Sequence, residues 1–336
     1  MASTSMATTT TELPYCVVSD AQIVLLWPTI DLFGINIYVG IVCISAVVLN
    51  FVVLMSTKKF RRQYSVVIVL CVAEMFAELG IILEATTRRP LFLDAIAAKR
   101  AEKMSSRQCL QPWVLSQTIG DFWCPSLEFL MGLERMCAVT FPHFFRRIFV
   151  PNNIKIILFV SLVAALFVIT PTAITIIYPT DNVRWSCGRK AAYGSNFGLV
   201  DYSYNVIGFS LAFTFNLIAM FNATSIKHTK QSALNLTKLK CYTAISFLST
   251  LLVSVPNLFS ILNVFTTVSS LLMTPAPILA CANGAIQFFV YLTLNVEYRQ
   301  RFIDLVTFNR MKVVRVKPLL SFRQASTSTF RASVFH

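Results

Sequence analysis

The stretch CLQPWVLSQTIGDFWCPSLEFLMGLERMCAVTFPHFFRR, residues 109–147, decides how this sequence folds. It begins with Cys109, reaches a Glu-Arg-Met triplet at residues 134–136, and ends in a basic segment after Pro142. At about 1.5 Å per residue, a helix from Cys109 to Arg135 is about 39 Å long, close to the thickness of a bilayer with its headgroups. The stretch therefore predicts a membrane-spanning helix with one end at each surface.

The composition of the chain is that of a membrane protein. Of its 336 residues, 56% are hydrophobic and only 13% are charged, whereas soluble domains carry about 25% charged residues. No charged residue lies between Lys240 and Glu297, which leaves room for two spans of about 20 residues each and a short turn. The sequence therefore predicts an all-α, polytopic membrane protein.

Seven apolar segments of spanning length follow one another along the chain. The Ser/Thr-rich residues 1–32 are expected to form an extracellular segment without a cleavable signal peptide, because they lack the basic residues with which such a peptide begins. The seven-transmembrane bundle is expected over 33–296, and a short cytoplasmic juxtamembrane helix with a basic Ser/Thr-rich tail over 297–336. The predicted spans are 33–56, 64–84, 110–137, 154–178, 199–222, 241–263 and 271–294.

The distribution of Lys and Arg predicts which side of the membrane each connection faces. Basic residues gather on one side, with four, three, four and eight of them in 57–63, 138–155, 223–240 and the tail from 295. The connections on the other side, 85–108 and 179–198, carry six and three. We therefore expect an extracellular N-terminus and a cytoplasmic C-terminus. The net charge of +14 then reflects topology and attraction to anionic lipids of the inner leaflet, rather than binding to nucleic acid.

The connection 85–108 is unusually basic for the predicted outer side. It could form an amphipathic helix that rests on lipid headgroups, or it could attract anionic ligands. The third alternative is that the predicted topology is wrong here. Its charged residues are Arg88, Arg89, Lys99, Arg100, Lys103 and Arg107, with Asp94 and Glu102 opposing them.

Polar residues and prolines stand in a characteristic order along the predicted spans. The triplet 134–136 at the end of span three is followed by Pro142, and a short amphipathic segment, 297–302, follows span seven. The other spans contribute Asn50 in span one, Glu74 in span two, Pro256 in span six and the series Gln287-Phe-Phe-Val-Tyr291 in span seven. In this order and spacing the chain resembles the rhodopsin-like G-protein-coupled receptors over roughly residues 33–302.

The sequence also departs from that pattern. No tryptophan lies in span four or directly before Pro256, the proline expected before Tyr291 is absent, and the triplet ends in Met136. The series Arg-Met-Cys-Ala-x-x-x-Pro from Arg135, with two phenylalanines after the proline, is more similar to the nematode serpentine chemoreceptor families. The chain is therefore identified as a divergent relative of these receptors.

The resemblance implies a receptor rather than an enzyme, chemosensory in role, which transmits the binding of an extracellular ligand to a heterotrimeric G protein by rearranging its helices. It implies a coupling site at Glu134, Arg135, Pro142 and Tyr291, where Glu134 and Arg135 form an ion pair that opens when span six moves. The expected location is the plasma membrane, or more narrowly the ciliary membrane of sensory cells. Two alternatives are an ion-conducting or transporting protein that uses the buried carboxylates, and an insect-type odorant channel with its N-terminus inside.

Three of the nine cysteines, Cys16, Cys109 and Cys187, lie on the predicted outer side, where disulfides form. A bridge between Cys109 and Cys187 would fix the connection between spans four and five across the extracellular opening, and the same pair belongs to the family resemblance. Cys16 would then be unpaired, or would have a partner that the sequence does not reveal.

Span three carries a polar and acidic stripe. Its members recur at steps of four and three residues and so share one helical face, which is expected to face the bundle because charges facing lipid cost several kcal/mol. The stripe consists of Gln117, Asp121, Cys124, Glu128, Met131 and Arg135. In span two, Glu74 and Glu78 also share a face.

Three interpretations of these acids remain open, and each assumes that no Lys or Arg neutralises them. The acids could be protonated and hydrogen-bonded, or Asp121 could contact a cationic ligand. Alternatively, a sodium ion or water cluster could bind at an intramembrane polar site made of Asn50, Glu74, Glu128, Asn283 and Gln287. No other cofactor is expected, since His143, His228 and His336 lack metal-ligand spacing.

The remaining expectations concern partners. An extracellular ligand, whose identity the sequence does not reveal, would bind near the outer end of the bundle. Its pocket candidates are Trp113, Gln117, Asp121, Asp201 and Tyr202. In the tail from 310, six Ser and Thr residues could be phosphorylated and recruit an arrestin-like protein, or the tail could simply be a solvated disordered segment.

Overall fold

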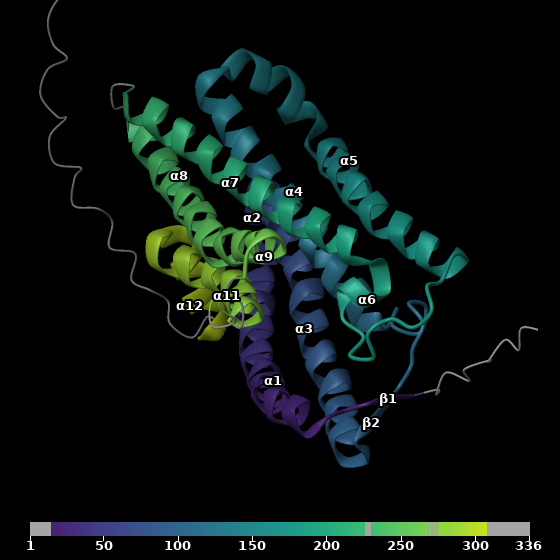
Figure 1. Ribbon diagram of the computed structural model, residues 1–336. Helices are drawn as coiled ribbons and strands as arrows, with labels where there is room; N and C mark the ends of the chain where they lie inside the picture. Colours follow the sequence, from purple (N-terminus) through teal and green to yellow (C-terminus); the bar gives the residue numbers. More distant parts are fainter. Residues whose placement is uncertain (1–14, 226–229, 268, 270–271, 273–274, 308–336) are drawn as a thin grey trace, which may run out of the picture.

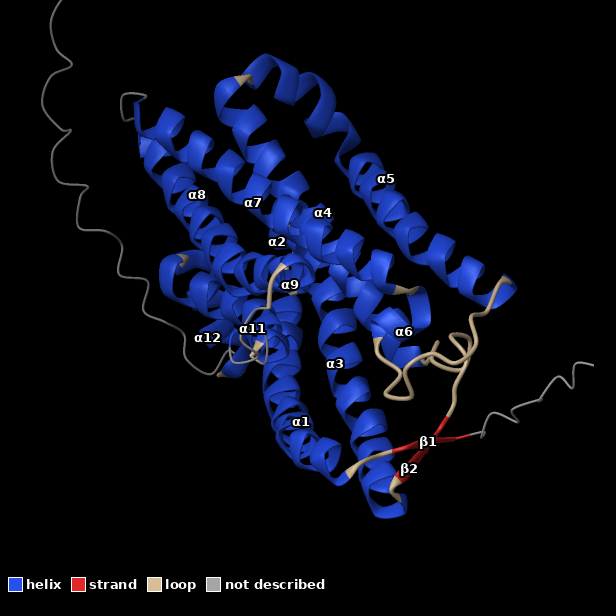
Figure 2. Cartoon of the chain, viewed as in Figure 1, coloured by secondary structure: helices blue, strands red, loops and turns tan. Residues whose placement is uncertain are grey.

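The computed structural model describes residues 15–225, 230–267, 269, 272 and 275–307. Figures 1 and 2 show a bundle of long helices with one short two-stranded ribbon at one end. The helices are α1 (Asp20–Met55), α2 (Lys58–Gln63), α3 (Ser65–Ala98), α4 (Pro112–Thr140), α5 (Pro142–Ile177), α6 (Arg189–Tyr193), α7 (Ser195–Ser225), α8 (Lys230–Ser249), η1 (Thr250–Ser254), α9 (Val255–Phe265), α11 (Ala276–Leu294) and α12 (Val296–Val306). The strands are β1 (Tyr15–Val17) and β2 (Arg100–Glu102).

Six helical segments among the described residues are long and apolar enough to cross a membrane. They coincide with six of the seven predicted spans, which confirms the helical membrane class. The segments are Asp20–Met55, Ser65–Ala98, Pro142–Ile177, Ser195–Ser225, Leu239–Phe265 and Ala276–Leu294. Large apolar side chains such as Leu158 and Phe159 on α5 are 63% and 66% exposed, as expected of a surface that lies against lipid rather than water.

The remaining long helix, α4, lies inside the bundle. It packs against α3, α5 and α7 (Figure 1), and its buried residues run from Trp113 to Cys137. This enclosure explains why α4 is less apolar than the others, because its polar stripe meets neighbouring helices. All six residues of the predicted stripe are buried or half-buried, as expected: Gln117, Asp121, Cys124, Glu128, Met131 and Arg135.

Several helices extend beyond the predicted span boundaries. α1 begins at Asp20 rather than 33, after a capping box in which Ser19 and Gln22 exchange hydrogen bonds. α3 continues to Ala98 instead of ending at 84. In the α3 extension, Phe92 packs on Phe33 of α1, with ring centroids 5.5 Å apart, and it shares a buried cluster with Ile30 in the added part of α1. The added helical turns thus bury apolar surface that hydropathy alone does not reveal.

The predicted connection 85–108 is therefore mostly a continuation of α3. It is not a separate amphipathic helix on headgroups, and several of its basic residues have partners within the protein. Arg88 pairs with Glu84, and Lys99 pairs with Asp20 at 2.8 Å. After α3 ends, β2 pairs antiparallel with β1, with Cys16 opposite Ala101.

The span that contains α8, η1 and α9 changes its helical pitch before a proline. η1 is a π-helix of five residues, and Pro256 is the second residue of α9. Proline cannot donate a backbone hydrogen bond, and a π-turn is one way in which a continuous helix accommodates such a break. Pro256 thus follows closely on a π-turn, two of whose residues, Leu252 and Val253, line the cavity described below.

Candidate functional site

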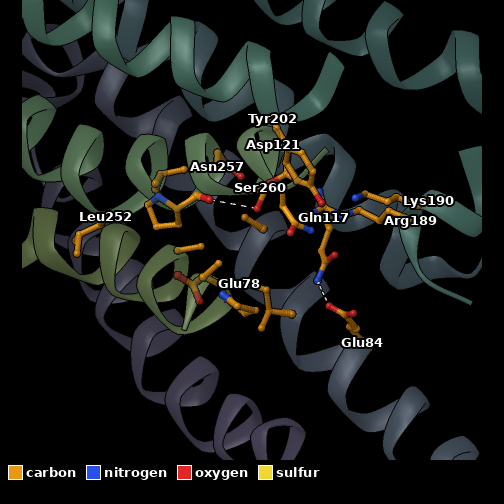
Figure 3. A pocket seen from close by; sticks show the side chains of 18 residues that line it. Glu78, Glu84, Gln117, Asp121, Arg189, Lys190, Tyr202, Leu252, Asn257 and Ser260 are labelled. Atoms are coloured by element: carbon orange, nitrogen blue, oxygen red, sulfur yellow. Dashed lines mark hydrogen bonds and ion pairs between the residues drawn. The ribbon is translucent and has the colours of Figure 1, made fainter. Parts of the chain in front are cut away.

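A cavity of about 340 Å³ lies among α3, α4, α6, α7, η1, α9 and α11. Its volume falls within the roughly 300–1,000 Å³ of small-molecule sites. One wall is charged and the opposite wall, from η1, α9 and α11, is neutral (Figure 3). The charged or amide side chains of the first wall are Glu78, Glu84, Gln117, Asp121, Arg189 and Lys190, and the neutral wall includes Leu252, Val253, Pro256, Asn257, Ser260 and Ala280.

Arg189 joins two carboxylates at the charged wall. Its Nη1 atom donates to Oδ2 of Asp201 at 2.8 Å and also contacts the carboxylate of Asp121. Asn205 supports Asp201 from the next turn of α7, with Nδ2 3.3 Å from Oδ1. Burial alone would lower the pKa of the Arg189 guanidinium, but the charge of Asp201 raises it overall, so Arg189 is a cation. The expectation that no basic residue neutralises the acids is therefore wrong for Asp121.

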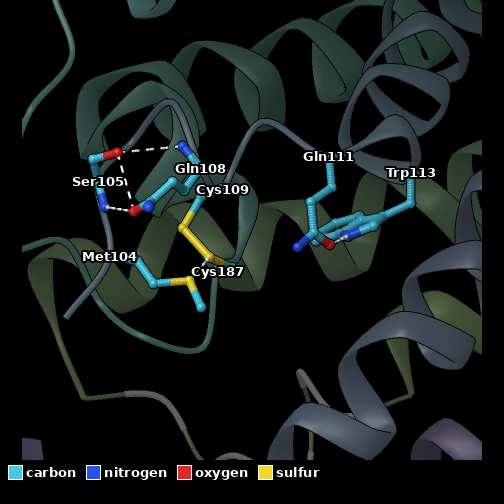
Figure 4. Close-up of a disulfide and its surroundings, with 7 residues drawn as sticks. All are labelled: Met104, Ser105, Gln108, Cys109, Gln111, Trp113 and Cys187. Atoms are coloured by element: carbon cyan, nitrogen blue, oxygen red, sulfur yellow. Dashed lines mark hydrogen bonds between the residues drawn. A yellow bond between two sulfur atoms is a disulfide. The ribbon is translucent and has the colours of Figure 1, made fainter. Parts of the chain in front are cut away.

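The fold places Arg189 here by fixing its short helix on both sides. α6 begins after Gly188 and ends at Gly194, whose φ of 89° is a conformation that glycine adopts readily. Thr175 on α5 donates to the backbone oxygen of Ala192 at 3.1 Å. Before α6, Cys187 is joined to Cys109 by a disulfide (Figure 4), which confirms the predicted bridge.

Gln117 belongs to a second polar group that holds α3 to α4. Its Nε2 donates to Oε2 of Glu84 at 2.7 Å, and Arg88 pairs with the other oxygen of Glu84. The Arg88 guanidinium also lies 5.7 Å from the Trp113 ring centroid. Trp113 is 1% exposed and packs beside the disulfide, and it does not line the cavity.

Three of the five predicted pocket residues line the cavity, and two do not. Gln117, Asp121 and Tyr202 line the cavity, whereas Asp201 lies behind it and holds Arg189. Arg189 was not among the pocket residues predicted from the sequence. No signal at this position could have found it, because the connection 179–198 has no periodicity and its contacts are tertiary.

A buried acidic group lies between the cavity and the other end of the bundle. Glu74 accepts a hydrogen bond from Gln287 Nε2, and Glu128 accepts one from Ser249 Oγ at 2.7 Å. Glu74 and Glu128 are 3% and 0% exposed, and each has one oxygen without a hydrogen-bond partner. The acids are therefore within the bundle, as the stripe predicts.

The predicted sodium site is only partly assembled from these residues. Asn50 has a different partner, because its Oδ1 accepts a hydrogen bond from the Tyr298 hydroxyl at 2.8 Å. Asn283 is buried and its Oδ1 has no partner. The described ranges contain no group of three or more His, Cys, Asp or Glu that could hold a metal ion. A sodium ion at Glu74 and Glu128 stays a prediction.

At the far end of α4, Arg135 contacts a tyrosine rather than its acidic neighbour. Its Nη2 donates to the Tyr242 hydroxyl at 3.2 Å, and its guanidinium lies 4.4 Å from the centroid of that ring. Within the described part of the chain, no ion pair joins Arg135 to Glu134, contrary to prediction. Both side chains line the same small cavity, but adjacent residues on a helix are poorly placed to form an ion pair.

Tyrosines surround this end of the bundle. The Tyr291 ring lies 5.9 Å from Tyr64 and 6.4 Å from Tyr242, both edge to face. Tyr291 is 1% exposed, and its hydroxyl has no hydrogen-bond partner among the residues that the structure describes. Pro142, the last of the predicted coupling residues, is exposed and begins α5.

α12 follows α11 directly, in the position predicted for a juxtamembrane helix. Its residues hold it to the inner ends of α1, α2 and α3. Tyr298 donates to Asn50, and Asn295 Nδ2 donates to the Tyr64 hydroxyl at 2.7 Å. Arg301 Nε donates to Ser56 Oγ at 2.8 Å, and Lys59 pairs with Glu297 at 3.0 Å.

Comparison with known proteins identifies one family. The model of that family, described as the serpentine type 7TM GPCR chemoreceptor Srsx, matches residues 37–306. The match begins within α1 and extends to the last residue of α12. No curated protein matches the chain.

Proposed function

Because the chain belongs to the Srsx family of serpentine-type seven-transmembrane G-protein-coupled chemoreceptors, we propose that it carries a chemical signal from the cavity to a heterotrimeric G protein. Members of this class are receptors and not enzymes. In this proposal α4 also crosses the membrane, as the third of seven spans, the cavity faces the outside, and α12 and the Arg135 end face the cytoplasm. The proposed location is the plasma membrane, with the ciliary membrane of sensory cells as its narrower form.

The observation that carries the proposal is that α4 extends from the cavity to the end of the bundle that contains Arg135. Asp121 lines the cavity, and Arg135 lies 14 residues later on the same helical face, a distance of about 21 Å along the helix. Between them, Glu128 contacts Ser249, directly before the π-turn of η1. A ligand that changes the packing of α9 against α4 would therefore act on the helix that carries Arg135.

The proposed activation step is a shift between two packings. In the described state, Arg135 is held on Tyr242 of α8. Movement of α8 away from α4 would release Arg135 and open a groove, into which a G-protein helix could insert. The ligand would favour the open state only as far as it binds that state more tightly.

Charge supports the proposed orientation. α2 carries Lys58, Lys59, Arg61 and Arg62, all exposed, and a basic surface next to a span favours the cytoplasmic leaflet with its anionic lipids. The disulfide lies at the opposite end, and disulfides persist on the oxidising side. The proposed arrestin-like partner would bind the tail from 310, which lies outside the described residues.

The test is nucleotide exchange on a heterotrimeric G protein by the purified receptor in lipid, measured with a panel of volatile and water-soluble chemicals. Arg135→Ala is expected to reduce stimulated exchange to the receptor-free rate at unchanged surface expression. The matched control is Arg107→Ala, which removes an exposed cation at the other end and is expected to leave exchange unchanged. Ligand-dependent current in membranes without G protein, with no stimulated exchange on any G protein, would instead support a channel, and normal exchange by Arg135→Ala would contradict the role of Arg135.

A further inference from the structure

The charged wall of the cavity contains more negative than positive charge where Arg189 is bound. One guanidinium nitrogen, Nη1, contacts both Asp121 and Asp201. A single positive charge cannot neutralise two carboxylates, so the group of Arg189, Asp121 and Asp201 keeps one net negative charge. That charge lies at the edge of a space large enough for a small molecule.

The two carboxylates hold Arg189 in different ways. Asp201 is 3% exposed and is also bonded to Asn205, so it is a fixed partner within the protein. The Asp121 side chain is 29% exposed, lines the cavity, and has Arg189 as its ion-pair partner. A cation that enters the cavity could therefore replace Arg189 at Asp121 while Arg189 stays bound to Asp201.

A second carboxylate of the cavity, Glu78, has one oxygen without a donor among the described residues. Glu78 lines the cavity and is 2% exposed, and its Oε2 atom has no hydrogen-bond partner. A buried polar atom without a partner is unfavourable, and a ligand with N–H groups would supply the missing partner. Figure 3 shows Glu78 and Asp121 on the same cavity, facing the neutral wall that contains Asn257 and Ser260.

The other cation of the wall does not offset this preference. Lys190 is exposed, and its ammonium group lies 5.3 Å from the ring centroid of Tyr202. The neutral wall offers amide and hydroxyl groups but no further positive charge. Asp121, which shares its only described cation with Asp201, is therefore the charged group of the cavity that a ligand can reach, and it favours a cation over an anion.

From this geometry we infer that the cavity binds a small organic cation, a protonated amine that donates to Asp121 in place of Arg189 and reaches towards Glu78. Arg189 is then a built-in competitor, which must leave Asp121 before the amine can bind. The inference rests on the proposed function, because it names the ligand class of the same receptor cavity. It also predicts that Arg189→Gln and Asp201→Asn change the affinity for amines in opposite directions.

The test measures the thermal unfolding of purified receptor in detergent, without G protein, since a ligand that binds only the folded state raises the melting temperature. The probes are small alkyl and aryl amines, each paired with the alcohol and the carboxylic acid of the same carbon skeleton, at millimolar concentration. We expect stabilisation by amines and none by their alcohols. Asp121→Asn is expected to weaken amine binding by about 10- to 100-fold, the loss of a hydrogen bond to a charged group.

Arg189→Gln and Asp201→Asn provide the sharper comparison. Arg189→Gln removes the competitor and is expected to tighten amine binding by roughly tenfold, a gain that misfolding cannot produce. Asp201→Asn leaves Arg189 to neutralise Asp121 alone and is expected to weaken amine binding. The matched control, Arg184→Gln, removes an exposed cation of the same connection that does not line the cavity, and it is expected to change binding by no more than about twofold, since exposed charges are screened.

Three results would overturn the inference: stabilisation by carboxylic acids that is lost in Arg189→Gln, weaker amine binding in Arg189→Gln, or no stabilisation by any amine in the wild type and Arg189→Gln. The outcome is separable from that of the proposed function. Amine binding without nucleotide exchange would reject signalling and retain the site. Exchange stimulated by another class of ligand, with no amine binding, would reject the site and retain the receptor.

Discussion

Tyr298 joins α12 to the helix bundle through a single hydroxyl group. It is 0% exposed, and it donates to Oδ1 of Asn50, which is also 0% exposed. Burial raises the pKa of the Tyr298 phenol, so the group stays neutral and remains a donor throughout the physiological pH range. The side chain therefore satisfies a buried amide of α1 and fixes the start of α12.

Removing that hydroxyl is expected to destabilise the receptor. Tyr298→Phe leaves the Asn50 oxygen buried without its donor, which costs about 1–3 kcal/mol, and the melting temperature of the purified receptor should fall. The control is Tyr38→Phe on α1, where the side chain is 75% exposed and the hydroxyl has no buried partner to leave behind. Equal melting temperatures for the two variants would show that the bond to Asn50 contributes nothing measurable.

Between elements, α3 and α4 approach each other closely where Gly120 faces Ala77. A Cβ atom added at Gly120 would lie 2.4 Å from Cβ and 2.7 Å from Cα of Ala77. Small residues of this kind let helix backbones approach closely within membranes. The polar contacts of Gln117 with Glu84 on the next turns depend on that approach, so the packing of α3 on α4 also shapes the cavity wall.

Gly120→Ala is accordingly expected to separate α3 from α4 at a cost of about 1–3 kcal/mol, typical of an overpacked interior. Thermal unfolding and amine binding would both be measured, and both are expected to weaken. Gly34→Ala is the matched control, because nothing lies within 4 Å of the added Cβ in α1, and alanine is the better helix former. A Gly120→Ala receptor as stable as the Gly34→Ala receptor would mean that α3 and α4 can separate without loss of stability.

Helix positions could be predicted well from the apolar segments, but their ends could not. The span 64–84 stops where charged residues begin, whereas α3 continues to Ala98 because Phe92 finds an aromatic partner, Phe33, on α1. Hydropathy measures the cost of entering lipid and contains no term for such a contact. The same limit applies to α1, whose start at Asp20 is set by the capping box at Ser19.

Across the whole molecule, the sequence predicted the residues of single helices better than contacts between them. The stripe from Gln117 to Arg135 follows from helical periodicity alone, and its members do lie within the bundle. The contact partners of the stripe could not be predicted in this way. Arg189 contacts Asp121, and Tyr242 accepts a hydrogen bond from Arg135, and each pair joins segments that are far apart in sequence. Nothing local to either residue encodes such a pairing.

The orientation of the whole bundle can be tested through one cysteine. All nine cysteines lie in described ranges. Cys109 and Cys187 are joined, six of the seven others are buried, and Cys16 alone is exposed. Because thiol reagents need access to the sulfur atom, a membrane-impermeant maleimide should react at Cys16 and nowhere else in the folded receptor.

With the N-terminus outside, as proposed from the basic residues of α2 and the tail, intact cells are expected to label at Cys16. Labelling should disappear in Cys16→Ser and persist in Cys137→Ser, which removes a buried thiol at the proposed cytoplasmic end. An insect-type channel topology would place Cys16 inside. Wild-type receptor would then label only after permeabilisation, and that result would invert the bundle, moving the cavity to the cytoplasm and Arg135 to the cell surface.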